Sequence, residues 1–295
     1  MDYCFDTSAF GARHTLSLYD DPERPALVAG LLASGRVLIT SVNVFEASAC
    51  EDQTRRIGLI HLQKQLIGDY RPLLVPTELL RQVTLAHFQG APNATITISD
   101  NHWGIWNGLH EPEQLGERER QEVHNWKLSL ESPFNEAHRE ARSEFERVFL
   151  VAPQDKPLSV ARVIRLLREN EQLILNTASP VYKRITGTGL DLPRMRTLFQ
   201  DLPEWPLYLA GWAHSLYHRA LKREGFGATS NPGTVDLMSA IYLRHCDYFV
   251  TADAKQRRAL RVLNMFNTRE PRTRVISYQE FRRRLVIQHA VAANH

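Results

Sequence analysis

The sequence has few cysteines, no marked excess of either charge and no long apolar run. Its 295 residues include only three scattered cysteines, so we expect neither a disulfide scaffold nor a zinc cluster, but a reducing, cytoplasmic setting. The 36 Lys and Arg residues against 33 Asp and Glu residues leave a net charge of +3, which by itself does not indicate nucleic-acid binding. No run approaches the roughly 18 apolar residues that cross a membrane, and no secretory leader is evident, so no membrane partner is expected.

Several catalytic motifs are also missing. The sequence contains no GxxxxGK[ST], GxGxxG, GxSxG or HExxH pattern, which argues against a nucleotide-driven motor, a serine hydrolase or a zinc protease. His214 and His218 lie four residues apart on a predicted helix and share a face, but no third ligand is evident. Structural histidines are therefore favoured over a metal site.

The two ends of the chain alternate between short apolar runs and helical patterns, which is typical of a parallel α/β sheet. Asp21 and Ser41 are expected to cap two of the helices. The predicted strands are 3–5, 37–39, 73–76, 247–250 and 274–276. The predicted helices are 21–34, 41–49, 53–68, 77–87, 235–245, 254–262 and 278–284. We therefore expect one discontinuous domain made of residues 1–89 and 228–295.

Between these parts, residues 90–227 show little strand signal apart from 94–98 and are predicted to be a helical insertion with its own small core. Its predicted helices are 159–169, 171–184, 192–199 and 205–223, and the segment 112–150 is dense in Glu and Arg at helical spacing. All five tryptophans fall here: Trp103, Trp106, Trp126, Trp205 and Trp212. Core packing is favoured for them over a base-stacking platform.

The charge is unevenly distributed along the chain. Residues 254–284 carry ten basic residues against two acidic ones. This basic stripe is either a phosphate-binding face or a solvated surface with internal ion pairs, and the pattern does not choose between them.

Four acidic residues recur at the ends of predicted elements: Asp6, Glu46, Asp236 and Asp253. Ligands of open parallel sheets bind beyond the carboxyl ends of the strands, where Asp6 and Asp253 are expected, with the other two on helices nearby. Converging carboxylates repel one another unless a cation joins them, and oxygen ligands select Mg²⁺ or Mn²⁺. The matching chemistry is metal-assisted phosphodiester hydrolysis. Taken singly, each residue is better explained as a turn or helix cap or a surface residue, and only the joint pattern favours the metal site.

The segments that carry these acids resemble the PIN-domain nucleases, including the VapC-type toxins. The resembling stretches are 3–10, 38–46 and 236–253, the last with a helix and a strand that ends in Thr-x-Asp. The resemblance implies a three-layer α/β fold with a parallel sheet of four or five strands. It also implies a metal-dependent endoribonuclease with Asp6, Glu46, Asp236 and Asp253 at the metal and the hydroxyls of Ser8 and Thr251 beside it.

Several alternatives stay open. The chain could act on RNA as a toxin-type or processing nuclease, on DNA as a flap-type nuclease, or be a catalytically silent scaffold. An inhibitory antitoxin or regulatory protein and a second copy of the chain are further candidate partners. Lys255, Arg257 and Arg258 could hold substrate phosphates or be ordinary surface residues. By its position, the helical insertion could serve as a lid, an RNA clamp or a regulator.

Overall fold

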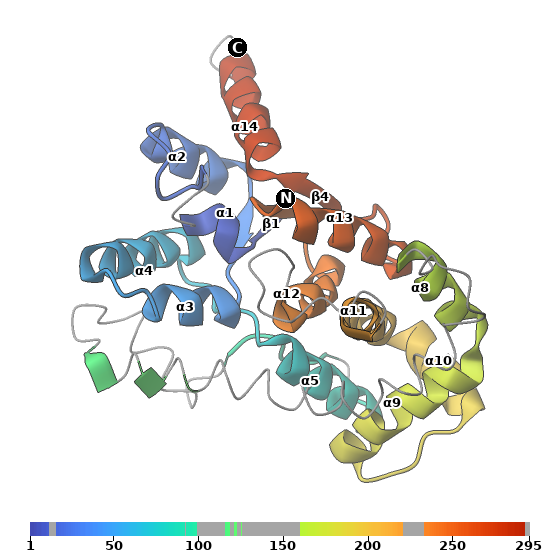
Figure 1. Ribbon diagram of the computed structural model, residues 1–295. Coiled ribbons are helices and arrows are strands. Elements are labelled where there is room, and N and C mark those ends of the chain that lie inside the picture. Colours follow the sequence, from blue (N-terminus) through green and yellow to red (C-terminus); the bar gives the residue numbers. More distant parts are fainter. Residues whose placement is uncertain are drawn as a thin grey trace.

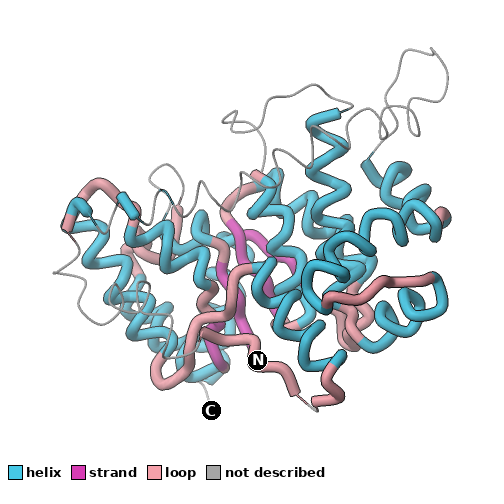
Figure 2. The backbone as a smooth tube through the Cα atoms, turned by 90° about the horizontal axis from the view of Figure 1, so that it is seen from below, coloured by secondary structure: helices cyan, strands magenta, loops and turns pink. Residues whose placement is uncertain are grey.

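A four-stranded parallel sheet lies between two groups of helices in the computed structural model (Figures 1 and 2). The structure describes residues 1–11, 16–91, 93–98, 116–118, 121–122, 125, 160–220 and 233–292. The strands are β1 (Asp2–Phe5), β2 (Arg36–Leu38), β3 (Tyr248–Thr251) and β4 (Arg274–Ser277), in the order β2-β1-β3-β4. All three strand pairs are parallel, which confirms an α/β fold whose sheet joins the two ends of the chain.

The fifth predicted strand, at 73–76, forms only isolated bridges. Leu73 pairs in parallel with Thr40 and antiparallel with Thr97, so residues 94–98 run back along this segment. Backbone hydrogen bonds from Leu74 to Ile96 and from Ile98 to Pro72 complete the pairing. Among the described residues, the regular sheet therefore has four strands, and a short irregular extension continues it beyond β2.

One face of the sheet is covered by helices from the two ends of the chain. These are α1 (Thr7–Gly11), α2 (Arg24–Ser34), α3 (Ser41–Ser48), α4 (Gln53–Ile67) and α14 (Tyr278–Ala292). They pack on a buried cluster that includes Phe5, Val37, Val250 and Ile276 from the four strands. The alternation of side chains along each strand assigns the neighbouring residues Cys4, Leu38, Phe249 and Val275 to the opposite face.

The opposite face is covered by helices from the middle and the last third of the chain. These are α5 (Pro76–Phe88), α8 (Val160–Glu169), α9 (Glu171–Thr186), α10 (Leu192–Asp201), α11 (Glu204–Ala220), α12 (Thr234–Met238) and α13 (Ala254–Leu263), with the 3₁₀ turns η2 (Ser239–Arg244) and η3 (Asn264–Phe266). One buried cluster joins Trp205 to Phe249 of the sheet. The described helices of the predicted insertion therefore share the core of the sheet, and the expectation of a separate core is wrong.

Trp205 shows how this shared core forms. It is fully buried, stacks on Phe199 and donates a hydrogen bond from its indole nitrogen to Thr84 of α5 at 3.0 Å. The packing role expected for the tryptophans is thus confirmed for Trp205. Trp103, Trp106 and Trp126, most of the segment 112–150 and the predicted domain boundary at 227/228 lie outside the described residues.

Three local predictions need correction. Thr40, not Ser41, caps α3, and the Ser41 hydroxyl instead donates to the carbonyl of Leu73 at 2.6 Å. Asp21 lies before α2, where its buried carboxylate accepts hydrogen bonds from Tyr278 and Arg282 of α14. The predicted helix 235–245 is α12 followed by the tighter turn η2. The bonds from Ser41 to Leu73 and from α14 to Asp21 join residues far apart in the sequence, which a local pattern does not show.

None of the helices in the described ranges combines the length and the apolar character that crossing a bilayer requires.

Candidate functional site

Asp6 lies directly after β1 at the carboxyl edge of the sheet. Its backbone nitrogen donates to the carbonyl of Val250 in β3, which fixes the first turn after the strand. Oδ2 accepts hydrogen bonds from the backbone nitrogen of Ser8 at 3.0 Å and from the Ser8 hydroxyl at 2.5 Å. Burial raises the pKa of Asp6, the hydrogen bonds from Ser8 oppose this, and the negative charge of Glu46 raises it further. The carboxylate is thus desolvated and lies within the field of a second acid.

The Ser8 hydroxyl joins the end of β1 to the turn after β3. Its oxygen accepts hydrogen bonds from the backbone nitrogens of Ala252 and Asp253 at 3.0 and 3.2 Å. It also lies 3.1 Å from the hydroxyl of Thr251, which is 3.3 Å from Oδ2 of Asp6. The two predicted supporting hydroxyls therefore lie beside Asp6 and hold the two chain segments together.

Gln256 lies at the centre of this network and was not among the residues predicted for the site. Its side chain is buried on α13, where Nε2 donates to Oδ1 of Asp6 at 3.1 Å and to the backbone carbonyl of Asp236 at 3.4 Å. Its Oε1 accepts from Thr251 at 2.6 Å. The only signal in the sequence was its position one helical turn after the cap Asp253, on the inward face of a helix with exposed basic residues.

Glu46 lies on α3, which a hydrogen-bonded cap orients toward α1. The side chain of Asn43 accepts from the backbone nitrogen and hydroxyl of Thr40, both at 2.8 Å, and donates to the Thr7 hydroxyl at 3.1 Å. The structure therefore brings two of the predicted acids, Asp6 and Glu46, close enough for their charges to interact.

Asp236 and Asp253 lie at the starts of α12 and α13 and make capping bonds. Oδ2 of Asp236 accepts from the backbone nitrogen of Gly233 at 2.8 Å. Oδ1 of Asp253 accepts from the backbone nitrogens of Lys255 and Gln256 at 2.6 and 3.0 Å. The capping alternatives are thus present in the structure. In both residues the capping bonds use one carboxylate oxygen. The N-terminus of a helix favours such an acceptor and its negative charge.

The acids do not assemble into a ready metal site. Within the described parts of the chain, no group of three or more His, Cys, Asp or Glu side chains is placed to hold an ion. Asp236 and Asp253 each use one carboxylate oxygen in a capping bond, and the convergence of the four carboxylates on one ion stays a prediction. The donor chemistry still suits a hard cation, because Asp6 and Glu46 supply neighbouring carboxylate oxygens. The metal ligands stay a prediction.

The basic stripe divides into two parts. Four of its arginines form ion pairs: Arg261 and Arg284 with Glu280, Arg269 with Asp247, and Arg282 with Asp21. This part fits the solvated surface with internal ion pairs. Lys255 and Arg258 are exposed at the start of α13, beside the cap Asp253, and Arg257 is half-buried there. These three remain the candidates for contacts with substrate phosphates.

No family model, no curated protein and no solved structure matches this chain.

Proposed function

We propose that the chain is a PIN-like, metal-dependent endoribonuclease whose active site lies at the carboxyl edge of the sheet. The observation that carries this proposal is the half-buried carboxylate of Asp6, held beyond β1 by hydrogen bonds from Ser8 and Gln256 and within the field of the second acid Glu46. Two carboxylates in each other's field are costly unless a cation binds between them. A parallel sheet also places its ligands at this edge.

Each residue has a defined role in this proposal. Asp6 and Glu46 would hold Mg²⁺ or Mn²⁺, and Asp236 and Asp253 would complete the ligands from α12 and α13. A bound divalent ion supplies an activated water and stabilises the leaving oxygen of a phosphodiester. Ser8, Thr251 and Gln256 fix the direction of the Asp6 carboxylate. Lys255, Arg257 and Arg258 would bind phosphates of the RNA strand beside Asp253.

A catalytically silent PIN-like scaffold is the second candidate. The capping bonds of Asp236 and Asp253 favour it, because both carboxylates already have a structural role. The two candidates differ in one measurable property. A live site binds Mn²⁺ and cleaves a phosphodiester, whereas a silent one does neither.

The test is cleavage of labelled single-stranded RNA, structured RNA and single-stranded DNA in Mn²⁺, with and without EDTA. Wild type is compared with Asp6→Asn, Asp253→Asn and Asp52→Asn. Asp52 caps α4 through a hydrogen bond to Arg55, as Asp253 caps α13, but lies outside the candidate site. Asparagine caps helices about as well as aspartate. Comparing Asp253→Asn with Asp52→Asn therefore separates the loss of charge at the candidate site from the loss of a helix cap.

We expect RNA cleavage by wild type and Asp52→Asn only in Mn²⁺, and loss of cleavage in Asp6→Asn and Asp253→Asn. Preferred cleavage of DNA would replace the proposed endoribonuclease with the flap-type DNA nuclease. Equal cleavage by Asp6→Asn would reject this site. A folded wild type that neither binds Mn²⁺ in calorimetry nor cleaves any of the three substrates would establish the silent scaffold.

A further inference from the structure

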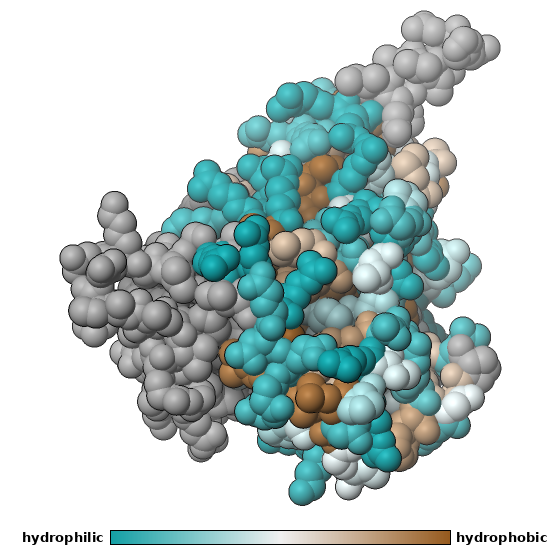
Figure 3. Space-filling view, turned by 90° about the vertical axis from the view of Figure 1, so that its right-hand side faces the viewer, coloured by the Kyte–Doolittle hydropathy of each residue, from teal (hydrophilic) through white to brown (hydrophobic). Residues whose placement is uncertain are grey.

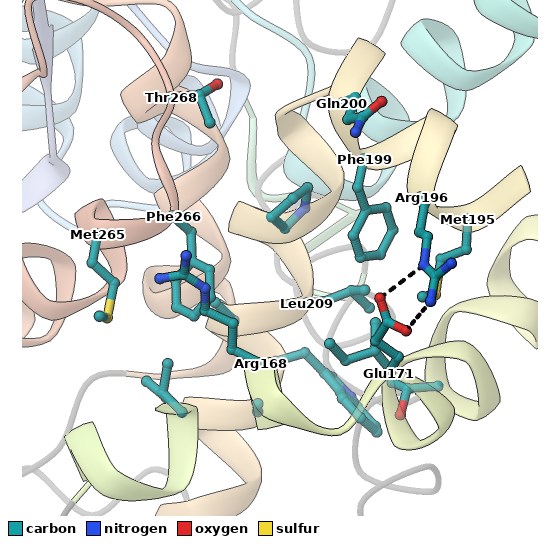
Figure 4. A pocket seen from close by; sticks show the side chains of 17 residues that line it. Arg168, Glu171, Met195, Arg196, Phe199, Gln200, Leu209, Met265, Phe266 and Thr268 are labelled. Atoms are coloured by element: carbon teal, nitrogen blue, oxygen red, sulfur yellow. Dashed lines mark hydrogen bonds and ion pairs between the residues drawn. The ribbon is translucent and has the colours of Figure 1, made fainter. Parts of the chain in front are cut away.

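A cavity of about 360 Å³ opens among the helices on the far side of α11 from α12 (Figure 4). This volume falls within the roughly 300–1,000 Å³ that is typical of small-molecule sites. Its walls come from α8, α9, α10, α11 and the turn η3, so five separate elements enclose it. Figure 3, which views the molecule from the side of α8 and α10, shows hydrophobic atoms exposed between hydrophilic ones.

The cavity has a mainly apolar lining with aromatic rings. Phe199, Trp212 and Phe266 contribute rings from three different elements, and each is only partly buried. Met195 and Leu209 add flexible and branched apolar surface. A partly open cavity with this lining gains free energy when an apolar body displaces its water.

The charges in the lining do not balance. Glu171 of α9 forms a bidentate ion pair with Arg196 of α10, with distances of 2.9 and 2.5 Å, so these two charges neutralise each other. Arg168 also lines the cavity, and among the described residues no carboxylate pairs with it. Figure 4 shows Arg168 beside Phe266 and away from the Arg196–Glu171 pair. Within the described part of the chain, Arg168 is therefore a positive charge at the rim of the cavity that no acidic side chain balances.

We propose that this cavity binds a small molecule with an apolar body and a single carboxylate. The apolar body would lie against Phe199, Trp212 and Leu209, and the carboxylate would pair with Arg168. A guanidinium recognises a carboxylate through two parallel hydrogen bonds, which fixes the orientation of the ligand. The site is separate from the acidic edge of the sheet, and the proposal does not rest on the proposed nuclease activity.

The test is calorimetric titration of the full chain with decanoate and with 1-decanol, which share an apolar chain and differ in charge. We expect decanoate to bind more tightly than decanol. Arg168→Gln should weaken decanoate binding by about fivefold, the upper range for a partly exposed ion pair, and leave decanol unchanged. Arg165→Gln is the matched control, because Arg165 is exposed on the same helix and does not line the cavity.

A second variant tests the location of the site. Thr177→Phe adds a ring to the cavity wall from α9 and should abolish binding of both probes, with the melting temperature showing that the variant folds. Equal binding of decanoate and decanol to wild type, or binding that survives Thr177→Phe, would overturn the proposal. Adenosine 5′-monophosphate serves as a third probe. Tighter binding of it than of decanoate, abolished in Thr177→Phe, would replace the carboxylate site with a nucleotide site.

Discussion

The acidic edge of the sheet and the cavity among the helices differ in the sign of the charge that each presents to a ligand. At the edge, hydrogen-bond donors within the chain surround Asp6, and the remaining charge is negative. In the cavity, the ion pair of Arg196 and Glu171 is complete, and Arg168 leaves a positive charge. The edge therefore calls for a cation, and the cavity calls for an anion with an apolar body.

Different kinds of contact hold the two regions together. The edge is held by hydrogen bonds between segments more than 240 residues apart, such as Asp6 with Gln256 and Ser8 with Asp253. The cavity is held by the packing of helices, and most of its lining is apolar. A polar substitution should therefore disturb the edge, and a change of volume should disturb the cavity.

Gln256→Leu should have the largest effect, and only at the edge. Leucine has a similar size but leaves Oδ1 of Asp6 without the donor Nε2 and Thr251 without its acceptor. Residues that orient metal ligands typically contribute about 10–100-fold to metal affinity, so calorimetry should show Mn²⁺ binding weakened by that factor. Decanoate binding should not change.

Gln172→Leu is the control, because Gln172 is exposed on α9. Unchanged Mn²⁺ affinity in a folded Gln256→Leu variant would show that Gln256 only packs. Weakening of both ligands would show that the two regions are not separate.

Gly211→Ala should reduce the free energy of unfolding by overpacking the contact between α11 and α12, where the two regions meet. Gly211 lies on α11 between Ala210 and Trp212, both of which line the cavity, and a Cβ there would lie 2.6 Å from the carbonyl oxygen of Leu237 in α12. Overpacking of this kind costs about 1–3 kcal/mol. The melting temperature should fall by several degrees, since about 1 kcal/mol shifts it by roughly 2–4 °C in a chain of 150–250 residues.

Gly189→Ala is the matched control, because a Cβ at Gly189 meets no atom within 4 Å. Equal melting temperatures for the two variants would mean that α11 and α12 can separate without cost. In that case, the contact between α11, which lines the cavity, and α12, which carries Asp236, would not be rigid.

Removing the exposed charges at the start of α13 should have a smaller effect, on RNA binding alone. Lys255→Gln combined with Arg258→Gln, in an Asp6→Asn background that prevents cleavage, should lower the salt dependence of single-stranded RNA binding. The slope of the logarithm of the binding constant against the logarithm of the salt concentration falls in magnitude by about 0.7 for each phosphate that the protein no longer neutralises. Fluorescence polarisation across a salt series measures it, with Arg165→Gln in the same background as the control. An unchanged slope would leave α13 without a role in RNA binding.

Much of the sheet was predictable, because apolar runs such as 37–39 and 247–250 have few alternative structures. The parallel pairing then follows from the helices between the strands, whereas the strand order is known only from the structure. The placing of Ser8 and Thr251 beside Asp6 was implied by the resemblance to the PIN-domain nucleases, and the hydrogen bonds of the structure agree with it. The orientation of the other acids was not predictable: the capping bonds of Asp236 and Asp253 compete with convergence, and a sequence does not show which bond a carboxylate makes.

The cavity and the shared core were harder to predict for another reason. Helical periodicity in 160–220 identifies apolar faces but not the elements that those faces contact. Trp205 was expected in a local core and instead bonds to Thr84, 121 residues away. Gln256 was missed because its only signal is its position one helical turn after Asp253, and spacing alone does not show that a single amide on a basic helix is buried against Asp6.

The smallest predicted effect is a pH dependence of α11, the helix that separates the two regions. Oε1 of Glu204, the first residue of α11, lies 3.3 Å from Nε2 of His245, which follows η2. Burial would raise the pKa of Glu204, but the interactions with His245, the backbone and Arg244 outweigh it and lower the pKa. A lowered pKa in the folded state stabilises the fold above the ordinary value of 4.5, and this stabilisation disappears as the pH falls through the folded value.

The melting temperature of wild type relative to Glu204→Gln should therefore be highest near pH 6 and decline below pH 4.5 as the carboxyl group becomes protonated. Thermal unfolding between pH 3 and about pH 6 measures the difference, and Glu169→Gln, exposed on α8, is the control. Decline of the cavity's affinity for the uncharged probe decanol in wild type relative to Glu204→Gln over the same range, with Mn²⁺ binding to the two proteins remaining equal, would assign α11 to the cavity. A difference in Mn²⁺ binding between Glu204→Gln and wild type, with unchanged affinity of the cavity, would assign α11 to the acidic edge, because α11 packs on α12 through Gly211.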